Sequence, residues 1–488
     1  MSRTGTDLFL AASARNRSVP LIVALAALCA STAGAAGFDD DFTGATLRVD
    51  YYHAGTAGEE HLALDRVRLE GPWPGSRARL IDTTNLGQYL LEVADRSTNA
   101  LLYTRGFGAI FGEWETTEEA LGGAWRAIPA AVRFPEPRRP FQLRIRKRAP
   151  DQSFREVWSV TIDPASRFVD RARLPAGKSW TIQESGDAAS KVDLVVLGDG
   201  YAAADEAKFR ADAERLTAAL WSHEPFAARR SDFNVRAVFT AASESGITRP
   251  RSGEFRATPL GARYNTFDSE RYVLTLDDRA WRDRAAVVPY EFVLMLVNER
   301  QYGGGGIFNV YSTAAVGSSY AAYLAVHEFG HHFAGLGDEY YTSPTAYADL
   351  LDVAVEPWEP NVTALLDPAR LKWADLASQA IALPTPWDKA AFEERSREFQ
   401  ARRQELREGG APEDQLERLF DEEREWSEGL LKRQAHAGRV GAFEGASYRA
   451  TGLYRPSADC IMFTRDRVGF CPVCRRAIER VIDLYAGP

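Results

Sequence analysis

The segment AVHEFGHHFAGLGDEYY, residues 325–341, constrains the fold more than any other part of the chain. It places His327 and His331 four residues apart, with Glu328 directly after the first. Residues four apart lie on one face of an α-helix, so both imidazoles can bind a single Zn²⁺ ion if the segment is helical. The apolar residues before the motif favour a buried helix, where a polar cluster without a partner would be costly. We therefore predict a zinc site on a helix.

The glutamate of this motif suits proton transfer better than metal binding. Glu328 is rotated by about 100° from His327 on a helix, and it can reach a zinc-bound water rather than the metal. As general base it would take a proton from that water, whose pKa the zinc lowers. His332 is rotated by the same angle from His331 and points away. These residue types at this spacing predict hydrolysis, with His327 and His331 as zinc ligands.

A third ligand has to come from beyond this helix. The metzincin spacing requires a histidine ten residues after the first, but Gly337 stands there and Asp338 follows it. An unbroken helix would carry Asp338 about 16 Å along its axis, so the chain must turn back. Gly335 and Gly337 permit such a turn through positive φ. Asp338 is the predicted third ligand; Glu339 is the alternative, as is a role for this acid pair in orienting the histidines.

The periodicity of apolar residues changes along the chain. At 488 residues, two or three domains are expected. Between 37 and 165, alternating segments such as TLRVDYY, FQLRIRKR and VWSVTI predict an N-terminal all-β sandwich. From 180 to 488, strands such as VDLVVLGDGY and YEFVLMLVN alternate with helical patterns such as DEAKFRADAERLTAALW. This alternation predicts an α/β catalytic domain.

Two segments of the second domain have further interpretations. Residues 303–315, GGGGIFNVYSTAA, read as a glycine-led strand that either pairs with an extended peptide or is an ordinary edge strand. Residues 388–436 are rich in charge, and GGAP interrupts them. This pattern predicts a helical hairpin inserted into the catalytic domain, with its charges on a solvated face. A role as a lid or docking element is the alternative.

The first 36 residues resemble a secretory signal peptide. Three arginines, the apolar run VPLIVALAALCA and the small residues 33–35 supply its three regions. The apolar run is shorter than a membrane span, so we expect cleavage, a secreted or periplasmic protein and no transmembrane anchor. Lipid anchoring at Cys29 is disfavoured by the bulky Leu28 before it. Removing the signal changes the net charge from −9 to −11, which argues against a nucleic-acid partner.

The remaining cysteines, Cys460, Cys471 and Cys474, all lie within the last 30 residues. Clustered cysteines in an exported protein predict a local disulfide with one thiol left over. A redox role for CPVC would need a thioredoxin-like context, which the sequence lacks. A structural zinc would need four ligands, and three cysteines are too few.

The stretches HEFGHHFAGLGDEY, GLYRPSADCIMF and FCPVCRRAI resemble the immunoglobulin-A-peptidase family of bacterial zinc metalloendopeptidases. The resemblance covers residues 37–488 and implies a β-rich N-terminal domain before a metzincin-like catalytic domain. It also implies zinc ligation by His327, His331 and Asp338, with Glu328 as general base. Met462 would form an apolar floor beneath the metal.

These observations predict a secreted zinc metalloendopeptidase that hydrolyses protein or peptide substrates. Tyr340, Tyr341 and Tyr454 are candidates for stabilising an oxyanion. The alternative is a surface protein that binds protein or glycan and carries a structural or inactive metal site. The intact His-Glu-His set argues against that alternative, because a structural zinc fills its fourth position and needs no adjacent base.

Overall fold

The computed structural model describes residues 37–174, 177–343 and 352–486. The signal peptide expected over residues 1–36 lies outside these ranges. The chain from Phe38 onward forms one compact unit. Among the described residues, no helix has the length and apolar character needed to cross a membrane.

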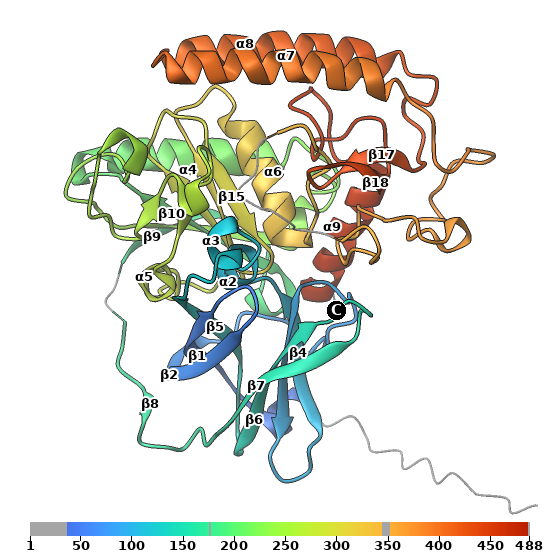
Figure 1. The fold of residues 1–488 in the computed structure, drawn as a ribbon. Helices are drawn as coiled ribbons and strands as arrows, with labels where there is room; N and C mark the ends of the chain where they lie inside the picture. The colour runs from blue at the N-terminus through green and yellow to red at the C-terminus, as the bar shows by residue number, and fades with distance from the viewer. Residues whose placement is uncertain (1–36, 175–176, 344–351, 487–488) are drawn as a thin grey trace, which may run out of the picture. The chain divides into compact units, whose positions relative to one another are not determined.

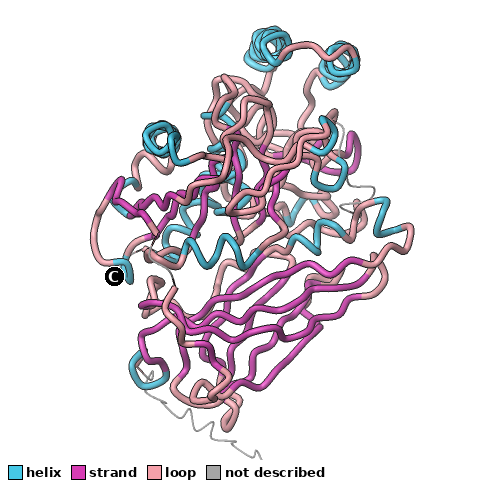
Figure 2. The backbone as a smooth tube through the Cα atoms, turned by 90° about the vertical axis from the view of Figure 1, so that its left-hand side faces the viewer, coloured by secondary structure: helices cyan, strands magenta, loops and turns pink. Residues whose placement is uncertain are grey.

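The N-terminal region is rich in β-structure (Figures 1 and 2). Within the described part of residues 42–170, strands form two four-stranded sheets, ordered β5-β1-β2-β8 and β4-β3-β6-β7. Most of the neighbours are antiparallel, and β8 joins β2 in parallel. The strands are β1 (Phe42–Gly55), β2 (Glu60–Pro72), β3 (Tyr89–Asp95), β4 (Leu101–Phe107), β5 (Arg126–Pro137), β6 (Phe141–Arg148), β7 (Phe154–Ile162) and β8 (Val169–Asp170). Short helices are α1 (Phe38–Asp41), α2 (Ile110–Trp114) and α3 (Glu118–Leu121).

The two sheets share one hydrophobic core. Alternate residues of β1, Leu47 and Val49, are fully buried in it, as are Leu143 and Ile145 of β6 in the opposite sheet. Side chains of successive strand residues point to opposite faces, so this alternation directs one face of each sheet inward. The period-two pattern of the sequence is therefore the cause of the two-layer arrangement.

The second region is an α/β structure around a larger sheet. In the ranges that the structure describes, this sheet has six strands in the order β15-β16-β14-β10-β11-β9. Strands β16, β14, β10 and β11 run parallel, and the edge strands β15 and β9 run antiparallel to their neighbours. The strands are β9 (Lys178–Gln183), β10 (Val192–Asp199), β11 (Phe233–Phe239), β14 (Phe292–Val297), β15 (Gly304–Ile307) and β16 (Tyr311–Ala315). Two small pairs are β12 (Ala262–Arg263) with β13 (Leu274–Thr275), and β17 (Phe443–Ala446) with β18 (Arg449–Arg455).

Helices cover this sheet. They are α4 (Glu206–Leu220), α5 (Asp278–Ala285), α6 (Ala321–Ala334) and the C-terminal α9 (Pro472–Tyr485). Helix α6 carries the histidine motif and packs against β15 and β16 as well as α4 and α9 (Figure 1). Its apolar side chains, among them Leu324, Phe329 and Phe333, enter the main hydrophobic core. This burial fixes which face of the helix the histidines occupy.

Residues 303–315 form two strands rather than the single strand expected. Gly304 pairs with Ala314 and Ile307 with Tyr311, so β15 and β16 are an antiparallel hairpin. Asn309 lies in the turn with a φ of 54°, a conformation that asparagine adopts more readily than most residues. The apolar pattern continued through this turn, and the sequence therefore hid it. Strand β15 is the edge strand of the sheet.

The charged segment forms two helices, α7 (Lys389–Glu408) and α8 (Glu413–Lys432), which lie side by side (Figure 1). Phe399 of α7 and Leu416 of α8 are buried, whereas most charged side chains are exposed or half-buried. The break between them falls at Gly409–Pro412, where GGAP interrupts the pattern. That this pair is an insertion into the catalytic domain stays a prediction.

The β-rich region contacts the α/β region through a mixed core. Phe111 and Trp114 of α2 are buried in one cluster with Trp281 of α5 and Met295 of β14. Arg133 of β5 donates a hydrogen bond of 2.9 Å to the Tyr290 carbonyl and stacks on its ring. The N-terminal region is thus packed against the sheet that carries the histidine helix.

Candidate metal centre and active site

Helix α6 ends at Ala334, within one turn of His331, the second histidine of the motif. Gly335 caps it with φ 60° and ψ 31°, and its N–H bonds to the His331 carbonyl at 3.0 Å. This left-handed residue reverses the chain, as the sequence predicted. Gly337 does not have a positive φ, contrary to expectation. A side chain there would instead meet Val362 Cγ2 at 2.9 Å, so Gly337 is needed for close packing.

The turn brings Asp338 back to the two histidines. His327 Nε2 lies 3.2 Å from Asp338 Oδ1, and His331 Nε2 lies 3.1 Å from the same oxygen. The two Nε2 atoms are 3.1 Å apart. Three atoms from residues 327, 331 and 338 therefore form a nearly equilateral triangle.

The other ring nitrogen of each histidine faces a backbone carbonyl. His327 Nδ1 lies 2.9 Å from the Ile461 oxygen, and His331 Nδ1 lies 2.5 Å from the Leu336 oxygen. A carbonyl only accepts hydrogen bonds, so each Nδ1 carries a proton, and when the ring is neutral its lone pair lies on Nε2, which faces Asp338. This second contact is the one that orients metal-binding histidines. With both rings neutral, three electron-pair donors therefore converge on one point.

The triangle fits a zinc ion. A metal 2.0–2.1 Å from three tetrahedral ligands separates them by about 3.3–3.4 Å, close to the 3.1–3.2 Å found for these atoms. Two imidazoles and one carboxylate also match the ligand types of catalytic zinc sites, which keep a fourth position open. His327, His331 and Asp338 are therefore placed to hold a divalent metal.

The electrostatics of these side chains attract positive charge. Burial alone would lower the pKa of His331, but the adjacent Asp338 outweighs it and raises that pKa to about 9. For the pKa of Asp338, burial acts upward, yet the two histidines hold it well below its usual range. Burial also raises the pKa of Glu328. A cation bound among these groups would replace the proton that they otherwise attract.

Glu328 lies beside the triangle, between α6 and β15. Its ligand oxygen is within 4.8 Å of the nitrogens of His327 and His331. A Cβ atom on Gly304 would lie 3.0 Å from Glu328 Cγ, and one on Gly306 would lie 2.9 Å from His331 Cβ. The glycines of β15 are therefore what allows the motif helix to approach this strand so closely.

A cavity of about 410 Å³ opens over these residues. His327, Glu328, His331 and Asp338 all line it. Part of its lining comes from the N-terminal region, which contributes Gln88, Gly108, Ala109, Gly112, Glu113, Thr116, Arg148, Ala149, Pro150 and Gln152. The β-rich region therefore shapes the candidate active site directly, which the sequence did not indicate.

Comparison with protein families agrees with this geometry. Residues 180–482 match the model described as IgA Peptidase M64, and residues 37–159 match the one described as Peptidase M64 N-terminus. The first match alone spans more than half of the chain. The chain belongs to the IgA peptidase M64 family. Membership identifies it as a peptidase, and the candidate metal-binding residues place it among the metallopeptidases. No curated protein matches it.

A tyrosine of this M64 peptidase that the sequence did not single out contacts the candidate third ligand. Tyr448 Oη donates a hydrogen bond of 2.5 Å to Asp338 Oδ2, while Oδ1 faces the histidines. Tyr448 and Ser447 form the turn between β17 and β18, with φ of 63° and 47°. Strained residues of this kind are concentrated at functional sites. Asp338 is thus oriented from 110 residues away, and no spacing rule signals that contact.

The tyrosines named as oxyanion candidates lie in different places. Tyr340 lines the cavity, and its hydroxyl accepts a hydrogen bond of 3.0 Å from half-buried Arg271. Tyr341 packs near Phe463 outside the cavity lining, and Tyr454 lies on β18, also outside it. Only Tyr340 of the three keeps a position near the candidate metal ligands.

Two further expectations concern residues around α6. Buried His332 accepts a hydrogen bond from Val293 N–H, and burial lowers its pKa to about 3; it lies outside the cavity lining, in agreement with the expectation that it points away. Met462 is fully buried, and a Cβ on Gly330 would lie 3.1 Å from its sulfur. It therefore packs against the helix that carries the motif.

The expected disulfide is wrong. Cys460, Cys471 and Cys474 are buried free cysteines, and the Sγ atoms of Cys460 and Cys474 are 3.9 Å apart. A disulfide requires about 2.05 Å between the sulfurs. Glu339 points into this cysteine group, where it accepts a hydrogen bond of 3.3 Å from Cys474, and it does not face the histidines. Between the two neighbouring acids, the structure thus brings Asp338, and not Glu339, to His327 and His331.

Proposed function

We propose that this M64 peptidase is a zinc-dependent metalloendopeptidase, with Glu328 as its general base. The observation that carries the proposal is the convergence of His327 Nε2, His331 Nε2 and Asp338 Oδ1 to within 3.1–3.2 Å at the wall of an open cavity. Membership of a peptidase family supports the reaction class. A structural zinc site would be closed, whereas these atoms leave one side facing the cavity.

Each side chain has a distinct task in this proposal. Zinc held by the three ligands would acidify a water molecule and polarise the scissile carbonyl. Glu328 takes the proton of the attacking water and then delivers it to the leaving amine. Its raised pKa favours holding that proton between the two events. Tyr448 holds the Asp338 carboxylate so that Oδ1 faces the histidines.

The substrate would be an extended protein or peptide segment. Strand β15 borders the cavity through Gly304 and Gly306, and it is the edge strand of the sheet. Extended peptides bind such edges by main-chain hydrogen bonds. The residues of the N-terminal region that line the cavity would contact substrate side chains. We also propose export, on the basis of the signal-like residues 1–36.

The test compares wild type, Glu328→Ala and Glu425→Ala, in which Glu425 is an exposed glutamate of α8 outside the cavity. Zinc content and cleavage of a denatured protein are measured on all three. We expect zinc in every protein and cleavage by wild type and Glu425→Ala only. Zinc-free protein, or cleavage that survives Glu328→Ala, would reject the proposal. The alternative, a surface protein that binds protein or glycan through its β-rich region, would then be favoured.

A further inference from the structure

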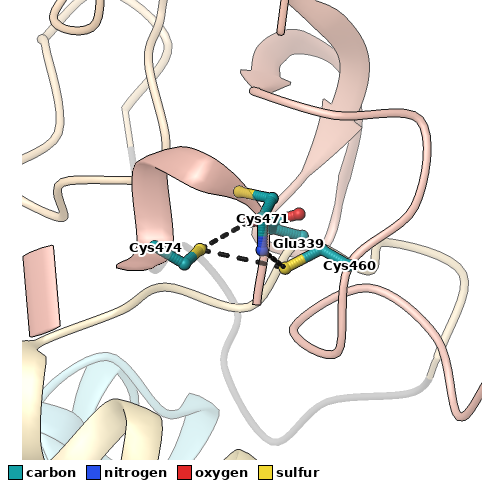
Figure 3. A group of neighbouring side chains, drawn as sticks. All are labelled: Glu339, Cys460, Cys471 and Cys474. Carbon is teal, nitrogen blue, oxygen red and sulfur yellow. Dashed lines mark hydrogen bonds between the residues drawn. The ribbon is translucent and has the colours of Figure 1, made fainter. Parts of the chain in front are cut away.

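A second group of ligand-type side chains lies outside the cavity (Figure 3). Glu339 follows the turn after α6, Cys460 lies in the loop after β18, and Cys471 and Cys474 lie at the start of α9. Their exposed fractions are 0%, 0%, 5% and 0% respectively. One potential ligand atom of each lies within 4.8 Å of those of the others. Four ligand-type side chains from separate parts of the fold thus meet in one buried place.

The distances resemble those of a tetrahedral zinc centre. A zinc ion about 2.3 Å from two thiolates separates the sulfurs by about 3.8 Å, and Cys460 Sγ and Cys474 Sγ are 3.9 Å apart. For one sulfur and one carboxylate oxygen the same geometry gives about 3.5 Å, and Cys474 Sγ lies 3.3 Å from Glu339 Oε1. Both separations therefore match those expected around a bound zinc ion, and the ligand atom of Cys471 lies within 4.8 Å of the other three.

The carboxylate of Glu339 supplies a second, independent indication. Its Oε1 accepts a hydrogen bond of 3.0 Å from Asn361, but its buried Oε2 has no hydrogen-bond partner among the described residues. A buried carboxylate without compensation costs several kcal/mol. The nearby Arg455 directs its guanidinium at the carbonyls of Gly445 and Ala458, so it does not pair with Glu339. A cation among the four side chains would remove this penalty.

Local structure also favours thiolates here. Cys471 occupies the N-cap of the 14-residue helix α9, with Pro472 as its first residue. The positive end of the helix dipole stabilises a thiolate at that position. The backbone N–H of Cys471 lies 3.3 Å from Cys460 Sγ. A disulfide between Cys460 and Cys474 would leave Cys471 and Glu339 buried and unused.

We propose that Glu339, Cys460, Cys471 and Cys474 bind a second, structural zinc ion. All four tetrahedral positions would be filled by protein, so this site would have no open position for substrate or water. It would join the turn after α6 to the 460–462 loop and to α9. Glu339 N–H already donates a hydrogen bond of 2.8 Å to the Met462 carbonyl. The ion would thereby hold the residue next to Asp338, and it would position the third ligand of the first site.

The experiment measures zinc per chain for the full-length protein purified with reductant, for His331→Ala and for Cys460→Ser/Cys474→Ser. We expect about two zinc ions in wild type and one in His331→Ala. Cobalt-substituted His331→Ala should show a thiolate-to-metal charge-transfer band, which histidine and carboxylate ligands do not produce. The double serine variant should lack that band. This site does not depend on the proposed peptidase activity, because none of these readouts requires cleavage.

Mass measurement of alkylated protein covers the case in which the double variant fails to fold. Wild type should have all three thiols protected from alkylation in the native state and all three reactive after unfolding with a chelator. A disulfide, detected as the loss of two hydrogens and of two reactive thiols, would overturn the proposal. So would His331→Ala protein that is free of zinc and shows no charge-transfer band with cobalt.

Discussion

The two ligand groups of this peptidase differ in the way that separates catalytic from structural metal sites. The open group, His327, His331 and Asp338, offers three donor atoms and faces a cavity of about 410 Å³. The closed group, Glu339, Cys460, Cys471 and Cys474, offers four donor atoms and is almost fully buried. Asp338 and Glu339 are neighbours in sequence, but Asp338 contacts the two histidines whereas Glu339 contacts Cys474. An adjacent acid pair can therefore serve two centres with different tasks.

The comparison also shows how Asp338, the proposed third ligand, is held. Asp338 is attached on one side to a residue of the closed group, and on the other side its carboxylate is bonded to Tyr448. Asn361 connects the residues on either side of Asp338, because it forms hydrogen bonds with Glu339 and with the N–H and carbonyl of Gly337. A loop residue gains the precision that catalysis needs from these supports.

The largest effect is expected from Glu328→Gln. This change keeps the size of the side chain but removes the base, and general-base catalysis contributes about 10²–10⁴-fold to rate. We expect kcat to fall by that factor, while zinc content and the protection of the three thiols stay unchanged. Steady-state cleavage of a fluorogenic peptide measures it, with exposed Glu425→Gln as the matched control. If the three thiols lost their protection from alkylation in Glu328→Gln, the two groups would not be independent of each other.

A smaller effect is expected from Tyr448→Phe, which deletes the hydroxyl that bonds to Asp338 Oδ2. Losing a partner of a metal ligand lowers metal affinity by about 10–100-fold. Activity measured against buffered free zinc should shift to higher zinc concentration and recover at saturation. Tyr454→Phe, on β18 outside the cavity lining, is the control. An unchanged zinc dependence would show that Tyr448 does not support Asp338.

The smallest effect is expected in the turn after α6, where Gly335 can be compared with Gly253, which follows the short helix Pro250–Ser252. Gly335 and Gly253 both have a left-handed φ, but only at Gly335 would a Cβ meet another side chain, Trp358 at 2.6 Å. We expect Gly253→Ala to cost about 1 kcal/mol of unfolding free energy through backbone strain alone. Gly335→Ala should cost more and also lower activity, because the turn positions Asp338. Denaturant unfolding measures both, and equal costs would contradict this role.

Sequence reasoning identified the open group because its signals are local. The spacing of His327 and His331 follows from the helix, and Gly335 indicates that the chain turns back within a few residues. The alternating strands of the β-rich region are local in the same sense. The hairpin of β15 and β16 was missed because apolar residues continue through its turn at Asn309.

The closed group was missed because its fourth ligand is distant in sequence. Counting cysteines gave three, and a disulfide was the natural interpretation for a chain that the sequence predicted to be exported. Glu339 joins them from more than a hundred residues away, and only the fold shows which of two adjacent acids does so. The same holds for Tyr448 and for the cavity wall formed by the N-terminal region.

The central claim is that Asp338 and Glu339 serve separate centres, and Asp338→Asn tests it most directly. The measurement combines cleavage, zinc content and the cobalt–thiolate band on one preparation of this variant. We expect cleavage to be lost and zinc to fall by about one ion per chain, while the band matches that of wild type. Loss of the band together with cleavage, or cleavage that persists, would contradict the account.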